Sequence, residues 1–191
     1  TGGGTVIHGW DVTFSAMFPR TKSHAGLPSD ISAGYQAISD SIIRGLQEIG
    51  IGVNRHDQSL DSSLPNICIA NPAKYDVMIN GKKIAGIAQR RNSAGLLFQV
   101  YIALDIPSHD ILTVVSKQPD FERLLQTKTT SINQHQSRRF LRTEIEQAIQ
   151  HGFEKILGFS LNEGKLLPEE IEMAEQLAST KYSTESWNFR R

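Results

Sequence analysis

Residues 76–92 read DVMINGKKIAGIAQRRN, and this stretch predicts the centre of the fold. Its two apolar runs are separated by Asn80-Gly81, and both residues tolerate the positive φ that a two-residue hairpin turn requires. We therefore predict a β-hairpin. Its second strand carries Lys83 followed by small residues, so the polar head of a ligand could approach the backbone and meet a positive charge. The alternative is an ordinary hairpin with an exposed lysine.

The composition is that of a globular domain without excess charge. The 191 residues suggest one domain, and 39% hydrophobic residues are enough for a core. Twenty Lys and Arg balance twenty Asp and Glu, so neither nucleic acid nor a membrane surface is expected as a partner. The single Cys68 excludes an internal disulfide and a Cys-based zinc site, and no metal site is expected. No apolar run approaches the roughly 20 residues of a membrane helix, and a cytoplasmic location is expected.

Helices and strands are expected on both sides of the hairpin. Apolar residues recur every four positions up to residue 49, which predicts a helix capped by Ser29 or Asp30. Thr143 and Glu146 have the spacing of a capping box at the start of a later helix. Further strands are predicted near 6–8, 12–16, 52–55, 67–70 and 96–104, and further helices near 108–115, 121–125 and 168–181. The predicted fold class is α+β, with a mixed, largely antiparallel sheet flanked by helices.

Three separated stretches form a recognisable set. They read TGGGTVIHG from residue 1, YDVMINGKKIAGIAQRR from residue 75 and KYSTESWNF from residue 181. Together they resemble the family of lipoate–protein ligase A and the octanoyltransferases, in the order that this family has them. The resemblance implies the catalytic-domain fold of biotin and lipoate protein ligases. It also implies a single catalytic domain over 1–191 that lacks its natural N-terminal portion and has no accessory C-terminal domain.

The resemblance implies a catalytic site built around Lys83, which would hold the acyl carbonyl of the substrate. Attack on an activated acyl group builds negative charge on the carbonyl oxygen, and losing one positioned donor to that oxygen costs roughly 3–4 kcal/mol. Cys68 is the second catalytic candidate. The substrate-binding positions implied by the resemblance are Gly2, Gly3, Gly4, Thr5, Val6, His8, Asp76, Gly86 and Ala88.

Two chemistries for attaching a lipoyl or octanoyl group to a carrier lysine stay open. The favoured one is an ATP-dependent lipoate–protein ligase, in which ATP with Mg²⁺ activates free lipoate as lipoyl-adenylate. Gly4 favours it, because the cysteine branch of the family usually has arginine there. In the alternative, the Cys68 thiolate takes an octanoyl group from acyl carrier protein and passes it to the target lysine. Cys68 lies in an apolar segment, however, where a free cysteine is as often a small buried hydrophobe.

The implied partner is a lipoyl carrier domain, either of a 2-oxoacid dehydrogenase E2 or of a glycine-cleavage H protein. One departure from the family stands on the strand after the hairpin. A His–Gly pair is usual there, but this chain has Phe98, Gln99 and Val100. Val100 in place of glycine is expected to narrow the pocket, which would reduce activity or change the acyl preference. The departure leaves a non-enzyme alternative, a degenerate lipoate- or carrier-binding module.

Overall fold

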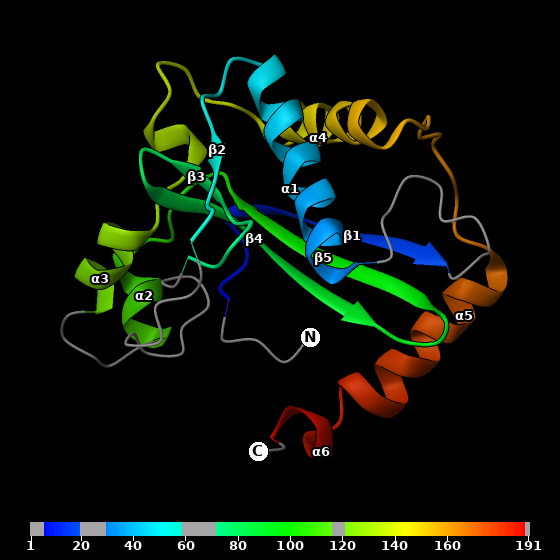
Figure 1. The fold of residues 1–191 in the computed structure, drawn as a ribbon. Coiled ribbons are helices and arrows are strands. Elements are labelled where there is room, and N and C mark those ends of the chain that lie inside the picture. Colours follow the sequence, from blue (N-terminus) through cyan, green and yellow to red (C-terminus); the bar gives the residue numbers. More distant parts are fainter. Residues whose placement is uncertain (1–5, 20–29, 59–71, 116–120, 190–191) are drawn as a thin grey trace. The chain divides into compact units, whose positions relative to one another are not determined.

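The computed structural model describes residues 6–19, 30–58, 72–115 and 121–189. The chain divides into two compact units, Thr1–Ser160 and Leu161–Arg191, so the predicted single domain stays a prediction. The described elements of the first unit are β1 (Asp11–Pro19), α1 (Ile31–Glu48), β2 (Asn54–Arg55), β3 (Val77–Ile79), β4 (Lys82–Arg91), β5 (Gly95–Ala103), α2 (His109–Val115), α3 (Phe121–Lys128), a 3-10 turn (Ile132–Gln134) and α4 (Arg142–Leu157) (Figure 1).

The five strands of the described chain form one sheet in the order β1-β5-β4-β3-β2. Every neighbouring pair is antiparallel, which confirms the predicted α+β class with a largely antiparallel sheet. The hairpin β3–β4 turns at Asn80 and Gly81, whose φ values are +50° and +76°. The predicted strand at 6–8 is wrong, because the chain enters the sheet only at Asp11. The predicted strand at 67–70 lies outside the described residues.

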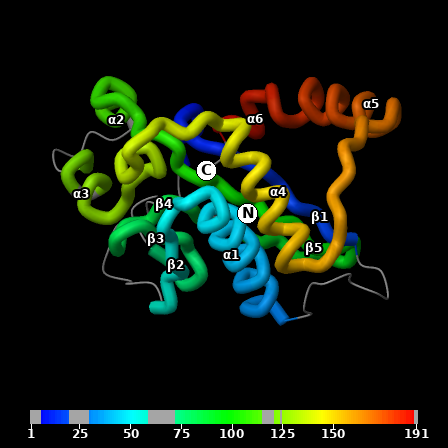
Figure 2. The backbone as a smooth tube through the Cα atoms, turned by 90° about the horizontal axis from the view of Figure 1, so that it is seen from above, coloured from blue at the N-terminus to red at the C-terminus, as the bar shows by residue number. Residues whose placement is uncertain are grey.

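One face of the sheet packs against α1 and α4, which lie side by side over the strands (Figure 2). Side chains alternate along a strand, so Phe98, Val100 and Ile102 of β5 all point to this face. They are buried there with apolar residues of both helices. On β1, the ring of Phe14 packs edge-to-face on that of Phe153 in α4, with centroids 5.5 Å apart. This face is therefore the hydrophobic core of the first unit.

The two helices cross with their backbones in contact. A Cβ atom at Gly45 of α1 would lie 2.1 Å from the carbonyl oxygen of Ala148. A Cβ atom at Gly152 of α4 would lie 2.1 Å from the carbonyl oxygen of Ser41. Because backbone atoms have no room to move aside, only glycine fits at either position. The close crossing fixes the helix pair that covers the sheet.

The helix starts were predicted with mixed success. Asp30 caps α1, and its carboxylate accepts a backbone N–H of the first turn at 2.9 Å. The predicted capping box of Thr143 and Glu146 is wrong, since α4 begins one residue before Thr143. Glu144 instead accepts the backbone N–H of Leu141, at 2.8 Å. A carboxylate at the third helical position reaches back to the residue before the helix, so a shift of the boundary selects a different glutamate.

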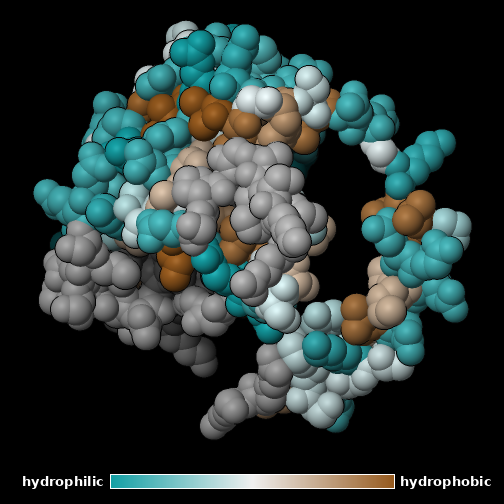
Figure 3. All heavy atoms as spheres, turned by 45° about the vertical axis from the view of Figure 1, so that its right-hand side comes forward, coloured by the Kyte–Doolittle hydropathy of each residue, from teal (hydrophilic) through white to brown (hydrophobic). Residues whose placement is uncertain are grey.

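The second unit consists of α5 (Pro168–Leu177), a π-helical turn (Ala178–Tyr182) and α6 (Glu185–Asn188). Its motif 181–189 folds on itself: the rings of Tyr182 and Trp187 pack edge-to-face, 5.1 Å apart, and the Lys181 ammonium lies 4.6 Å from the Trp187 ring centroid. Hydrophobic residues remain exposed among hydrophilic ones along this unit (Figure 3), namely Leu161, Leu166, Leu167, Ile171, Met173 and Leu177. Across both units, no described helix is long and apolar enough to cross a membrane.

Candidate active site

A buried ion pair joins β4 to Asp76, the residue directly before β3. The Lys83 Nζ atom lies 2.7 Å from Asp76 Oδ2, and the two side chains are only 5% and 4% exposed. The same carboxylate oxygen accepts the backbone N–H of Ala73 at 2.7 Å. Burial raises the pKa of Asp76, and the Lys83 ammonium opposes that rise. Removing one partner of a buried pair costs about 3–5 kcal/mol, so each charge holds the other in place.

An irregularity in the hairpin aims the lysine. Val77 pairs with Ala85, but the next residue of β3 pairs with Lys83, so Ile84 is an extra residue in β4. Such a bulge turns the side chains before and after it relative to one another. The backbone of Lys83 is also tied on its other side, since its carbonyl accepts the N–H of Thr130 at 3.0 Å. The main chain around the ammonium is therefore held from both sides.

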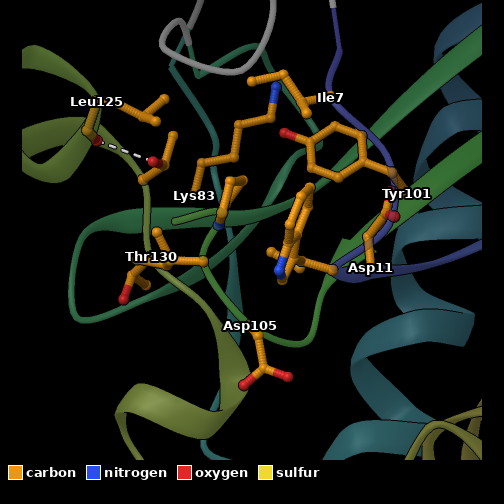
Figure 4. Close-up of a pocket in the computed structure, with 12 residues that line it drawn as sticks. Ile7, Asp11, Lys83, Tyr101, Asp105, Leu125 and Thr130 are labelled. Carbon is orange, nitrogen blue, oxygen red and sulfur yellow. Dashed lines mark hydrogen bonds between the residues drawn. The ribbon is translucent and has the colours of Figure 1, made fainter. Parts of the chain in front are cut away.

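Lys83 lines a pocket on the sheet face that α1 and α4 leave uncovered (Figure 4). The empty space between and in front of its lining residues amounts to about 490 Å³, which includes open solvent. Its lining comes from β4, from β1 and the segment before it, from β5 and the segment after it, and from α3 and the segment after it. The lining residues are Ile7, Trp10, Asp11, Lys83, Tyr101, Ala103, Asp105, Ile106, Pro107, Leu125, Thr129 and Thr130.

The two carboxylates in this lining already have partners. Asp11 accepts from His8 Nδ1 at 2.7 Å and from the N–H of Gly9 at 3.0 Å. Asp105 accepts from Arg139 at 2.6 Å. Lys83 is thus the cationic group in a lining otherwise made of apolar side chains, hydroxyls and paired carboxylates. This combination suits an apolar chain that carries a carbonyl oxygen at one end.

Tyr101 lies beside the ammonium and over Gly86. Its ring centroid is 5.7 Å from Lys83 Nζ, within the range of a cation–π contact. Gly86 is the direct partner of Tyr101 on the neighbouring strand. A Cβ atom on Gly86 would lie 2.6 Å from Tyr101 Cε1 and 3.0 Å from Lys83 Cε. Glycine is required here because the ring and the lysine fill the space that a side chain would take.

The structure brings together some of the predicted site residues. Lys83, Asp76 and Gly86 form one cluster. His8 is 57% exposed and contacts the pocket through Asp11, while Val6 and Ala88 are partly buried and do not line it. The roles predicted for all six residues stay predictions. Five further candidates lie outside the described residues: Gly2, Gly3, Gly4, Thr5 and Cys68.

The residue expected to narrow the pocket was the wrong one. Val100 is 4% exposed and lies in the core under α1 and α4. Its neighbour Tyr101 faces the pocket instead. A slip of one residue moves a side chain to the other face of a sheet. Gln99 is the one polar signal in the segment 96–104, and its exposure places Tyr101, two residues later, on the side opposite Val100.

Known proteins resemble this chain in both sequence and fold. The family model described as lipoyl protein ligase A/B catalytic domain matches residues 1–154. The octanoyltransferase LipM of Kyrpidia tusciae is 31% identical, over all of this chain and 73% of its own length. A lipoate-protein ligase A bound with ATP matches with a TM-score of 0.73 at 22% identity, over 93% of this chain and 64% of that one. A bipartite lipoate protein ligase of Thermoplasma acidophilum, studied with its E2 lipoyl domain, matches with a TM-score of 0.74 at 22% identity. The match covers 100% of this chain and 69% of that one.

Proposed function

Since the chain belongs to the lipoyl protein ligase A/B catalytic domain family, we propose that it attaches an octanoyl or lipoyl group to a lysine of a lipoyl carrier domain. The predicted family is thereby confirmed, as is the prediction that the chain is an enzyme, because the matched proteins are octanoyltransferases and lipoate-protein ligases. A lipoyl domain of a 2-oxoacid dehydrogenase E2 or a glycine-cleavage H protein is the proposed acceptor.

One observation carries the proposal: a buried ammonium lies in the wall of an apolar pocket, 2.7 Å from a buried carboxylate. When the amine of the carrier lysine attacks the acyl carbonyl, negative charge develops on the carbonyl oxygen. An ammonium whose side chain is only 5% exposed stabilises this charge more than a fully solvated one, because the local dielectric constant is lower. Asp76 positions Lys83 for this contact and does not itself touch the substrate.

For the acyl donor, an octanoyl thioester of acyl carrier protein has the stronger support. The relative that shares 31% identity is an octanoyltransferase, whereas the ligases share the fold at 22% identity. In this chemistry the Cys68 thiolate attacks the thioester, and the thiol of the acyl carrier protein leaves. The amine of the carrier lysine then attacks the octanoyl–Cys68 thioester. An amide bond forms, the amine loses a proton, and the Cys68 thiolate is released.

The ATP-dependent ligase is the second candidate. Gly4, which the ligases have at this position, supports it. Lys83 would then hold the α-phosphate of ATP as well as the acyl carbonyl, and Mg²⁺ would enter bound to ATP. Free lipoate or octanoate would be the acyl substrate.

One set of reactions separates these chemistries. The purified chain is incubated with a lipoyl domain and one of two acyl donors, octanoyl–acyl carrier protein or octanoate with Mg-ATP. Mass spectrometry then measures whether the mass of the lipoyl domain has increased by one octanoyl group. The octanoyltransferase modifies the domain only from the thioester and loses all activity after iodoacetamide treatment. The ligase modifies it only with ATP, resists iodoacetamide and exchanges pyrophosphate into ATP. The ATP reaction is repeated with lipoate in place of octanoate. If none of these acyl donors leads to a modified lipoyl domain, the proposed function is contradicted.

A further inference from the structure

We infer that Tyr101 restricts the site to acyl groups that are unbranched close to the carbonyl. This inference rests on the proposed function and deepens it by naming a substrate class. It comes from the position of the ring, which occupies the space directly beside the group proposed to hold the carbonyl oxygen.

The ring stands where the first carbons of an acyl chain must pass. An oxygen bound to Lys83 Nζ lies within hydrogen-bond distance of that atom, about 2.8 Å. The centroid of the Tyr101 ring is 5.7 Å from the same nitrogen. Because Tyr101 and Lys83 line the same pocket, an acyl chain that lies in this pocket with its oxygen on Nζ passes along the Tyr101 ring. Figure 4 shows the Tyr101 ring and the Lys83 side chain converging on the same end of the pocket, near Ile7.

The ring has no room to retreat towards the sheet. A Cβ atom on Gly86 would already lie 2.6 Å from Tyr101 Cε1, so the ring rests on the backbone of β4. β5 is an inner strand, and Tyr101 is paired with Thr13 of β1 on one side and with Gly86 on the other. The backbone that carries the ring is thus fixed on both sides. A branch on the acyl chain could therefore be accommodated only by turning the ring away from its place beside Gly86.

The rest of the lining permits a straight chain. Ala103 follows Tyr101 on the same face of β5 and has a small side chain, and Trp10, Ile106 and Pro107 add apolar surface beyond it. An unbranched chain loses no contact by passing the ring edge. An added methyl group that does not fit such a pocket lowers kcat/KM by roughly 10-fold to 200-fold.

The test compares two thioester donors, octanoyl and 3-methyloctanoyl, with the wild-type chain and with Tyr101→Ala and Tyr101→Phe. The wild-type chain is expected to prefer the straight donor by about tenfold or more in kcat/KM. Tyr101→Ala is expected to reduce this preference to about twofold or less, mainly by improving the branched donor. Tyr101→Phe keeps the ring and is expected to keep the preference. Tyr101→Leu, which is apolar but lacks the ring, replaces the alanine variant if that variant fails to fold.

The outcomes distinguish this inference from the proposed function. A wild-type chain without preference, or an unchanged preference in Tyr101→Ala and Tyr101→Leu, overturns the inference while acyl transfer stands. If the Tyr101 variants change the preference as expected but Lys83→Ala stays fully active, the role of Tyr101 is supported and the role of Lys83 is contradicted. If no donor is turned over, calorimetric binding of octanoate and 3-methyloctanoate to the same variants gives the same ratio without turnover.

Discussion

On the face of the sheet that α1 and α4 cover, Gly45 and Gly152 lie against backbone carbonyl oxygens; on the other face, Gly86 lies against the side chains of Tyr101 and Lys83. A backbone carbonyl in a helix cannot move aside without breaking helical hydrogen bonds, so a larger residue at the helix crossing should lower the stability of the fold. Side chains can rotate, so a larger residue at Gly86 displaces the ring and the ammonium. The same residue type thus supports the fold on one face and the site on the other.

The largest effect is expected from Lys83→Ala. Without the ammonium, kcat/KM for acyl transfer to the lipoyl domain should fall about 10²-fold to 10³-fold, as for other lost donors to a developing oxyanion. Lys82→Ala is the matched control, because the adjacent ammonium bonds the carbonyl of Gln126 outside the pocket. If Lys83→Ala and Lys82→Ala have equal activity, the pocket face of the sheet has no special role in acyl transfer, and the comparison of the two faces is wrong.

Gly152→Ala should disturb only the packing of α1 against α4, and it should therefore lower stability without lowering kcat/KM. The added methyl group meets the carbonyl oxygen of Ser41, and overpacking of this kind costs about 1–3 kcal/mol of the free energy of unfolding, measured in urea. Gly52→Ala is the control, since no atom lies within 4 Å of its Cβ position. The fraction that stays folded should keep wild-type kcat/KM. A loss of activity without a loss of stability would show that α1 and α4 take part in the chemistry.

Gly86→Ala should act in the opposite way. Its methyl group displaces the Tyr101 ring and the end of Lys83, so kcat/KM should fall about tenfold, the effect of roughly one misfitting methyl group in a pocket. The free energy of unfolding should change less than in Gly152→Ala, because flexible side chains yield. If Gly86→Ala is the less stable of the two variants, the comparison is wrong.

The smallest effect concerns the start of α4. Glu144 bonds Arg138 and the N–H of Leu141, and these contacts lower the pKa of its carboxyl. A lowered pKa in the folded state adds stability above the ordinary glutamate value of about 4.3, and this stability is lost as the pH falls through the lowered pKa. Glu144→Gln should therefore destabilise the protein at neutral pH and hardly at all in acid. Urea unfolding at both pH values checks this, and an equal difference at both would refute it.

The sequence predicted what local chemistry decides. The Asn80-Gly81 turn, the Asp30 cap and the helix start at Pro168 each depend on a few adjacent residues, and each is observed. Lys83 was predicted as a candidate because small residues follow it, and the structure places it in the lining of the pocket. The family resemblance located the same stretch independently.

The features that the sequence missed depend on pairing between distant segments. Lys83 stands next to the extra residue Ile84 of β4, and no short pattern shows a bulge of this kind. That Tyr101, rather than Val100, faces the pocket follows from the register of β5 with β4. The single polar residue of this strand, Gln99, indicates the same side for Tyr101, but it does not show that a pocket lies there.

The infrared frequency of a bound acyl carbonyl tests the role of Lys83 most directly. A ketone analogue of octanoyl-pantetheine, labelled with ¹³C at the carbonyl, is bound to the wild-type chain and to Lys83→Ala. A hydrogen bond from a buried ammonium polarises the carbonyl, so the stretching frequency should be lower in the wild-type complex than in the variant. The same frequency in both complexes would contradict the claim that this ammonium holds the reacting oxygen.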